Sequence, residues 1–452
     1  MKEMRILSPT AILGYGFPLG SFERGMARRP DAIGLDGGSS DPGPYYLGAG
    51  KPFVDREAVK RDLGIVIPAA KKAGVPVVIG TAGGSGARAH VDWCLKIIRE
   101  IAREKRLRLR TAVIQAEVPR ALVARALAAG RVRPLSFVPE LTPETLRRAG
   151  SIVAQMGMEP LIAALEKGVD LVVAGRCYDP AVFAAPAVMN GFDPGLAVHL
   201  GKIVECAAIA ATPGSGRDCV LGVLRKDAFT LEVLSDARRF TTASVAAHTM
   251  YEKSHPYLLP GPGGVLDLSE VSFRQAGESS VEVHGSRFVP GPASVKIEGA
   301  VRAGYRTFSI CGIRDRVMLG QLDPIFEAVR AAVEDNFGRG DYRVNFRVYG
   351  RDAVMGALEP LRDRVGHEVG VVIDVVAPTQ AQASTICGFA RSTALHYGYP
   401  GRMATAGNLA FPFSPSDFEA GAVYEFGVYH VMEIDDPARL FPAKLLTIGG
   451  GR

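Results

Sequence analysis

The sequence predicts an α/β fold, with a parallel βα N-terminal domain of Rossmann-like type and a second, smaller α+β C-terminal domain. At 452 residues the chain is longer than one hydrophobic core usually supports. Its first half alternates short, continuously apolar runs with segments rich in Ala, Arg and Lys, as parallel strands and their covering helices do. After about residue 215 short alternating runs rich in Gly, Pro, Val and Ser indicate antiparallel strands. We therefore expect domains at residues 1–215 and 216–452.

The apolar runs give the strands of the N-terminal domain, because a strand buried on both faces is apolar at every position. The expected strands are residues 5–8, 31–36, 75–80, 109–115, 133–137 and 169–174. The amphipathic segments between them give helices at about 57–73, 87–105, 118–130, 142–150, 155–167 and 180–190.

The C-terminal domain begins with antiparallel strands inside residues 258–312. These are followed by a helix at about 323–336, a strand at 342–350, another helix, a strand at 368–377 and a long helix at 379–398. The final segment, 400–447, is rich in loops and aromatic residues. We expect it to form a lid or an oligomer contact, since exposed aromatic side chains need to be covered.

The composition excludes several classes of protein. With 47% hydrophobic and 22% charged residues the chain is globular, and no apolar run reaches the roughly 20 residues that span a bilayer. The net charge of +6 is not gathered into a basic stripe, so we expect no nucleic acid partner, while an anionic small substrate fits. The six cysteines form no C-x-x-C pair, and the N-terminus has no signal core, so we expect a cytoplasmic protein.

Five polar or glycine-rich loops follow the predicted strands, at residues 13–21, 36–48, 80–90, 115–119 and 174–180. The carboxyl ends of parallel strands lie at one edge of a sheet, where ligands bind. We therefore expect these loops to gather around one site.

The loop "DGGSSDPGPYYLG" at 36–48 carries two carboxyls, Asp36 and Asp41. We expect them to act as a general acid/base pair or to hold a divalent metal, with Tyr45 contacting the substrate. The alternative is that Asp36 caps a turn and Asp41 forms a turn before proline. No histidine-rich spacing supports a metal, so the cofactor is left unassigned.

The loop "GTAGGSGARAH" at 80–90 follows a strand and opens a helix. Its residues Gly83, Gly84, Ser85 and Gly86 predict an anion-binding turn that uses backbone N–H groups. His90 would face the site or, as an equal alternative, be a solvated histidine. The alternative is a turn that only allows the helix and strand to pack closely. Dinucleotide binding is disfavoured, because Gln115 stands where a ribose-binding carboxylate belongs.

The loop "AGRCYDP" at 174–180 places Arg176 and Asp179 at another strand end. Arg176 is expected to bind a substrate carboxylate with two hydrogen bonds. The alternative is an Arg176–Asp179 pair within the loop. Cys177 is a weaker candidate nucleophile, since no histidine partner is evident.

Three later residues complete the candidate site. His248 and Glu252 lie in a cluster before a glycine-proline loop and are expected to carry protons, although a polar helix end at a domain junction explains them equally well. Asn408 in the aromatic segment is a candidate substrate contact. Glu205 in "HLGKIVECAA" would have a raised pKa if the helix buries it, and would otherwise be an exposed helix edge.

These blocks together resemble the acyclic terpene utilisation (AtuA) family. The resemblance rests on "GFPLGSFERGMARRPDAIGLDGGSSDPGPYYLGAG", "GTAGGSGARAHVDW", "AGRCYDPAVFAAP", "HLGKIVECAA", "AHTMYEKSHPYLLPGPGGVLDLS" and "ATAGNLAFPFSPSD", and it covers nearly the whole chain. It implies a role in the catabolism of branched terpenoid acids or their CoA thioesters. The glycine-lysine-rich C-terminal extension of longer terpene-pathway members is lacking, and members of this shorter type look as if they work with a small protein partner.

The leading hypothesis is an oligomeric enzyme that performs acid/base chemistry, as a hydratase/lyase or an isomerase, on a small carboxylic acid or its CoA thioester. Asp36 and Asp41 would supply the base, the Gly83–Gly86 loop and Arg176 the anion site, and His248 or Glu252 a second proton carrier. The rival is a non-catalytic subunit that binds an acid or acyl-CoA and activates a small partner protein. An NAD-linked oxidoreductase is a third, disfavoured alternative.

Overall fold

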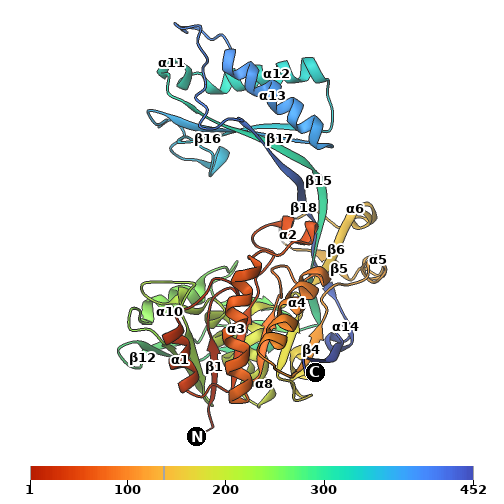
Figure 1. Ribbon diagram of the computed structural model, residues 1–452, viewed down its shortest axis with the longest axis vertical. Helices are drawn as coiled ribbons and strands as arrows, with labels where there is room; N and C mark the ends of the chain where they lie inside the picture. Colours follow the sequence, from red (N-terminus) through yellow and green to blue (C-terminus); the bar gives the residue numbers. More distant parts are fainter. Residues whose placement is uncertain (1, 136–137, 451–452) are drawn as a thin grey trace. The chain divides into compact units, whose positions relative to one another are not determined.

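The computed structural model describes residues 2–135 and 138–450 and divides the chain into two compact units. The first unit comprises Met1–Val301 and Phe426–Arg452, and the second comprises Arg302–Glu425. Strand β15 (Ser294–Ile313) carries the chain out of the first unit, and β18 (Asp417–Glu433) carries it back (Figure 1). These units differ from the division at residue 215 that the sequence suggested, because the strands just after this residue complete the first sheet.

The first unit is built on a ten-stranded sheet of order β12-β13-β9-β8-β1-β2-β3-β7-β4-β19. Its parallel strands are β1 (Met4–Ser8), β2 (Ala32–Asp36), β3 (Val77–Gly80), β7 (Leu171–Ala174) and β4 (Leu109–Ile114). The flanking strands are antiparallel: β8 (Val220–Leu224), β9 (Ala228–Val233), β13 (Ser280–His284), β12 (Ser272–Gln275) and β19 (Ala443–Ile448). In a Rossmann fold the first strand lies in the middle of the parallel strands. Here β1 is one of the two outermost of the five parallel strands, so the strand order differs from that of a Rossmann fold.

Helices cover both faces of this sheet. On one face α3 (Arg56–Ala73) and α4 (Arg88–Glu104) lie side by side and pack on apolar residues of the parallel strands (Figure 1). On the other face α8 (Asp179–Met189) packs on β2 and β3, where Gly34 leaves room for the ring of Phe183. Helix α9 (Pro194–Val204) packs beside α8 and against β8. The sheet is thereby buried on both faces, which explains its continuously apolar strands.

The ends of these helices follow local sequence signals. Helix α3 begins where the Asp55 side chain accepts hydrogen bonds from two backbone N–H groups, and it ends at Gly74 with a φ of +71°. The remaining helices of the unit are α1 (Leu19–Ala27), α2 (Pro44–Ala49), α5 (Arg120–Ala128), α6 (Pro143–Arg148), α7 (Glu159–Leu165), α10 (Thr242–Met250) and α14 (Pro437–Leu440), with a 3-10 turn, η1 (Ala207–Ala210). In the described part of the chain no helix is long and apolar enough to cross a membrane.

Further strands of the first unit lie outside the large sheet. Strands β10 (Leu258–Gly261), β11 (Gly264–Asp267) and β14 (Arg287–Pro290) form a small antiparallel sheet. Strand β6 (Ala149–Ala154) pairs antiparallel with β15, and β5 (Val132–Pro134) pairs antiparallel with β18. The prediction that 133–137 joins the parallel sheet was therefore wrong for its described residues, and 136–137 lie outside them.

The second unit is an antiparallel sheet with helices on one face. Its strand order is β16 (Arg343–Tyr349), β17 (Val369–Ala377), β15, β18. Helices α12 (Leu322–Phe337) and α13 (Gln380–His396) cover alternate residues of the sheet, and α11 (Arg316–Leu319) precedes them (Figure 1). The helix expected between β16 and β17 is only a 3-10 turn, η2 (Gly356–Leu358), and the loop-rich segment expected after residue 400 contains the long strand β18.

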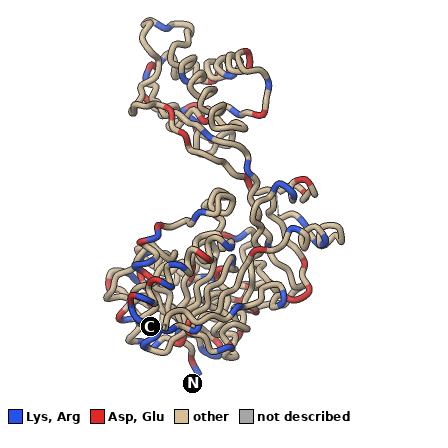
Figure 2. The backbone as a smooth tube through the Cα atoms, turned by 45° about the vertical axis from the view of Figure 1, so that its right-hand side comes forward, with Lys and Arg blue, Asp and Glu red and all other residues tan. Residues whose placement is uncertain are grey.

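The fold class is therefore mixed α/β, with a parallel-containing sheet in the N-terminal part and an antiparallel sheet later in the chain. Figure 2 shows basic and acidic residues interspersed along the backbone of each unit.

Candidate active site

The loops at the carboxyl edge of the parallel strands are tied together by hydrogen bonds. Gly37 donates its N–H to the carbonyl of Gly80, at 2.9 Å, and Thr81 donates to the carbonyl of Gly175, at 2.9 Å. The N–H of Cys177 donates to Oγ1 of Thr81, at 3.1 Å. Three of the five loops, those at 36–48, 80–90 and 174–180, therefore lie together at this edge, as predicted.

A cavity of about 310 Å³ opens beside these loops, within the first unit. Its walls come from the Asp-rich turn, the loop after β7, the end of α9, the turn after α10, and strands β10 and β15. The charged and hydroxyl side chains that line it are Asp41, Arg176, Tyr178, Asp179, Lys202, Glu205, Glu252 and Lys296. Acids and bases from distant parts of the sequence therefore share one small space.

Glu298 is a buried carboxylate that binds two residues of the cavity lining, Arg176 and Lys296. Its side chain is 0% exposed and accepts a hydrogen bond from Nε of Arg176 at 3.0 Å, and it also forms an ion pair with Lys296. Ser40 donates its hydroxyl to the other carboxylate oxygen at 2.8 Å. Burial by itself favours the neutral acid, but Arg176 and Lys296 outweigh it and lower the pKa of Glu298 to about 2. Glu298 therefore remains ionised and ties the Asp-rich turn to Arg176.

Glu205 lies on the other side, at the C-terminal end of α9. Oε1 accepts a hydrogen bond from Nζ of Lys202 at 3.0 Å, while Oε2 is buried and has no partner. Burial, with a further contribution from Asp179, raises the pKa of Glu205 to about 8 despite the opposing effect of Lys202. Near neutral pH most Glu205 carboxyls therefore hold a proton.

Tyr178 supplies a second unpartnered group on the same cavity. It stands at the N-cap of α8, and its hydroxyl is buried without a hydrogen-bond partner. Strand β10 packs closely on its ring, because a Cβ at Gly261 would lie 3.0 Å from it. Buried polar groups in folded proteins are nearly always hydrogen-bonded. Two such atoms, on Tyr178 and Glu205, indicate a place for ligand or solvent oxygen atoms.

Of the two carboxyls in the Asp-rich turn, Asp41 lines the cavity and Asp36 does not. Asp36 ends β2, and its Oδ1 accepts the N–H of Gly38 at 3.0 Å. Burial, and then the nearby Asp179, raise its pKa well above the ordinary value. Oδ2 of Asp41 accepts the hydroxyl of Ser39 at 2.8 Å. Within the described residues, no group of three or more His, Cys, Asp or Glu side chains is arranged to hold a metal ion.

The charge of Arg176 is already paired. The side chain is 2% exposed, and Nη1 donates to Oδ1 of Asp179 and to the carbonyl of Cys177, at 3.0 and 2.8 Å. Burial disfavours the ionised guanidinium, yet Glu298 and Asp179 outweigh it and raise the pKa of Arg176. Burial raises the pKa of Cys177 to about 12, which makes it a poor nucleophile at neutral pH.

The glycine-rich loop packs against other segments of the same chain. None of the loop residues predicted to bind the substrate lines the cavity. Gly86 has a φ of +66°, and a Cβ there would lie 2.1 Å from the backbone N of Arg176. Gly83 and Gly84 also have positive φ. An added Cβ would lie 2.8 Å from Cβ of His90 at Gly83 and 2.6 Å from Cβ of Phe53 at Gly84. The hydroxyl of Ser85 is buried without a partner.

His90 is buried beneath this loop. Its Nε2 lies 2.8 Å from the carbonyl of Lys51, and its Nδ1 accepts the N–H of Ala87 at 3.2 Å. Burial lowers its pKa. Both ring nitrogens are therefore engaged by backbone.

Glu252 lies at the rim of the cavity, whereas His248 is buried and does not line it. Glu252 has a φ of +54° and approaches Nζ of Lys202 at 3.5 Å. His248 is buried and stacks on the ring of Tyr251, with the ring centroids 4.8 Å apart. Burial, and then Lys202, lower the pKa of His248 to about 4, so this histidine is neutral at pH 7.

Two predicted contact residues lie apart from the cavity lining. Tyr45 is on α2 and makes an edge-to-face contact with Tyr46, with the ring centroids 5.5 Å apart. Asn408 belongs to the second unit, where its amide donates to the carbonyls of Ala394 and Tyr397 at 3.0 and 2.8 Å.

Sequence reasoning missed Lys296 and Glu298, and it included Tyr178 and Lys202 only as letters of the quoted motifs "AGRCYDP" and "HLGKIVECAA". The run Ser294–Glu298 has two charged residues, Lys296 and Glu298, on one face of a strand, with the apolar Ile297 between them. Charges at alternate positions of a strand usually face solvent, so nothing in the run marks Glu298 as buried. Its partner Arg176 lies 122 residues away in the sequence.

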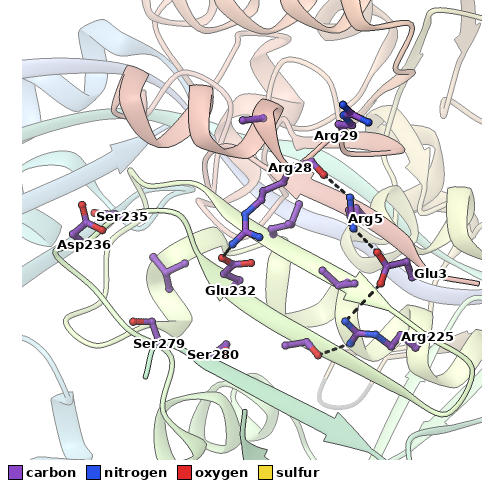
Figure 3. A pocket seen from close by; sticks show the side chains of 15 residues that line it. Glu3, Arg5, Arg28, Arg29, Arg225, Glu232, Ser235, Asp236, Ser279 and Ser280 are labelled. Carbon is purple, nitrogen blue, oxygen red and sulfur yellow. Dashed lines mark hydrogen bonds and ion pairs between the residues drawn. The ribbon is translucent and has the colours of Figure 1, made fainter. Parts of the chain in front are cut away.

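A larger cleft of about 750 Å³ lies at the amino end of β1, beside β8 and β9 (Figure 3). Three of the four arginines that line it are paired with carboxylates, since Arg28 pairs with Glu232, and Glu3 pairs with both Arg5 and Arg225. Among the described residues that line it, none has a buried polar side-chain atom without a partner. The smaller cavity is therefore the better candidate for chemistry.

The fold and site together define a class: a mixed α/β protein with a buried acid–base cluster at the carboxyl edge of its parallel strands. The family model described as acyclic terpene utilisation family protein AtuA matches residues 55–215 and 235–415. The chain thus belongs to the AtuA family, which is associated with acyclic terpene utilisation. Comparison with curated proteins and with solved structures gave no match.

Proposed function

We propose that the chain is an enzyme that performs acid/base chemistry, as a hydratase/lyase or an isomerase, on a small carboxylic acid or its CoA thioester. The observation that carries the proposal is Glu205, whose pKa of about 8 and unpartnered Oε2 make it a proton donor inside a cavity. A general acid is most effective when its pKa lies near the working pH.

Dehydration of a 3-hydroxy acid, whose hydroxyl is on the carbon adjacent to the one that loses the proton, illustrates the roles of the residues. Asp41, which lines the cavity, accepts a proton from the carbon next to the carboxyl group. Glu205 gives its proton to the departing hydroxyl, so that the C–O bond breaks, a C=C bond forms and water leaves. Lys202, 3.0 Å from Glu205, stabilises the carboxylate that remains. Hydration is the reverse, and isomerisation uses the same two groups without loss of water.

These roles modify the expectation from sequence. Arg176 keeps a structural role, because Glu298 and Asp179 occupy its guanidinium. Glu205 takes the place of His248 as the second proton carrier, since the pKa of His248 lies far below neutrality.

The test is hydrogen exchange at carbon, which all these reactions share. The protein is incubated in D2O with a panel of short hydroxy acids, the corresponding enoic acids and their CoA thioesters, and deuterium incorporation is followed by NMR. We expect the wild type to label at least one member of the panel and Glu205→Gln to label it about 100-fold more slowly or worse. Glu100→Gln is the matched control, because Glu100 forms surface ion pairs with Lys60 and Arg56.

Failure of the wild type to label any member would overturn the proposal. Ligand binding by calorimetry without labelling would instead support the rival function, a non-catalytic acid-binding subunit that activates a small partner protein.

A further inference from the structure

The rim of the cavity is acidic, and its cations lie deeper. The cationic groups that line it are Arg176, Lys202 and Lys296, with side chains only 2%, 7% and 17% exposed. The carboxyls at solvent-exposed positions of the lining are Asp41 and Glu252, and the side chain of Glu252 is 54% exposed. Two less exposed carboxyls, Asp179 and Glu298, are paired with Arg176.

Lys202 is the deep cation whose nearest carboxyl partner is neutral near pH 7. Lys296 and Arg176 face the ionised Glu298, so their charges are compensated. Glu205, the nearest carboxyl partner of Lys202, holds its proton up to about pH 8, and the exposed Glu252 lies farther from Nζ, at 3.5 Å. A ligand carboxylate beside Lys202 would supply a closer negative charge than Glu252 does.

The unpartnered atoms require further oxygen atoms from the same ligand. Tyr178 and the protonated Glu205 both line the cavity, and each has a hydrogen-bond donor without a partner. A carboxylate together with one hydroxyl or carbonyl oxygen satisfies Lys202, Tyr178 and Glu205 at once. Leu259 and Pro180 supply an apolar wall for a short hydrocarbon part.

A CoA thioester fits this arrangement poorly. It replaces the carboxylate by a neutral thioester, and its nucleotide carries several phosphate charges that would pass the rim. Among the described residues lining the cavity, the charged ones at exposed positions are both acidic, and like charges repel. The cavity of about 310 Å³ lies at the small end of ligand sites, which suits a compact acid.

We propose that the site takes a compact free carboxylic acid bearing a second oxygen, such as a hydroxy or oxo acid, in preference to the CoA thioester. This inference rests on the proposed function of the same cavity. Of the two substrate classes in that proposal, the free acid and its CoA thioester, the inference keeps only the free acid.

The test compares one acid in two forms. Each short hydroxy acid that is labelled in D2O is assayed as the free acid and as its CoA thioester, and kcat/KM is measured for both. We expect the free acid to have the higher kcat/KM, by about ten-fold or more. Glu252→Gln should reduce this preference by about three-fold or more, because it removes one rim charge, whereas Glu100→Gln should leave the ratio unchanged.

Failure here can be separated from failure of the acid/base proposal. A higher kcat/KM for the thioester, or a preference that Glu252→Gln does not change, overturns this inference, while loss of labelling in Glu205→Gln still supports acid/base chemistry. If neither form is labelled, the acid/base proposal fails. Calorimetric binding of the two forms then decides the ligand class, and tighter binding of the thioester overturns the inference.

Discussion

At the scale of single residues, Glu205 shows how burial, with a contribution from Asp179, raises the pKa of an ordinary carboxyl into the neutral range. The apolar helical run around Glu205 predicted that its pKa would be raised if the helix were buried. The helix is buried, and the pKa of Glu205 is raised. Lys202 lies three residues before Glu205 on the same helix, so the sequence does indicate this neighbour. It could not predict Asp179 and Glu252, because these reach Glu205 from distant parts of the chain. Nor could it predict that Oε2 would be left without a partner.

The raised pKa of Glu205 makes the stability of the protein depend on pH. Its pKa is about 4.3 in an unfolded chain and about 8 in the fold, so between these values only the folded state keeps the proton. The free energy of unfolding should therefore fall as pH rises through this range, with a contribution from Glu205 of about 1.4 kcal/mol per pH unit at most. Urea unfolding of the wild type and Glu205→Gln between pH 5 and 8 measures this difference. Equal slopes in the two proteins would contradict the assignment.

At the scale of elements, most helices and parallel strands follow local patterns that the sequence displays. The predicted helix 57–73 is α3, Arg56–Ala73, because an aspartate cap and a terminal glycine mark its ends. Strands β8 and β9 were missed. Strand β8 pairs antiparallel with β1, which lies more than 200 residues earlier in the sequence, and β9 joins the sheet by pairing with β8. No local pattern encodes such a distant partner for β8. Strand β18 was read as loop because glycine and aromatic residues interrupt its alternation.

The glycine-rich turn is an element whose role is tested by one substitution. Gly86→Ala should destabilise the protein by several kcal/mol, because its Cβ would lie 2.1 Å from the backbone N of Arg176. Gly130→Ala is the matched control, since Gly130 has a similar φ of +68° and nothing within 4 Å of the added Cβ. It should cost only about 1–2 kcal/mol, the penalty of the left-handed backbone. Equal losses of unfolding free energy in urea would show that close packing at Gly86 does not matter.

At the scale of the whole molecule, the chain forms two compact units, and the first is discontinuous in sequence. Composition suggested a boundary at residue 215, where the strand pattern changes from parallel to antiparallel. That change marks the point where the first sheet acquires its antiparallel strands, and the second unit begins only at Arg302. A change in strand type was thus read as a change of domain.

Excision of the second unit tests this division. A Cβ at Gly427 would lie 2.4 Å from Cγ2 of Val301, so the two ends of the excised segment are adjacent and a two-residue Asn-Gly turn can join them. A chain without 302–425 should still unfold cooperatively, as judged by circular dichroism. A chain that ends at residue 215 should not fold, because β1 loses its partner β8. Folding of the shorter chain, or failure of the excised one, would contradict the division.

The proposed acid/base function depends most on a protonated Glu205 in the cavity. NMR of the protein labelled with ¹³C at glutamate carboxyls measures the protonation of Glu205 directly. We predict one glutamate signal that titrates with a pKa of about 8 and is missing from Glu205→Gln. If every glutamate in the wild type titrates below about pH 6, close to the usual range for this side chain, Glu205 is ionised at neutral pH and the proposed proton donor does not exist.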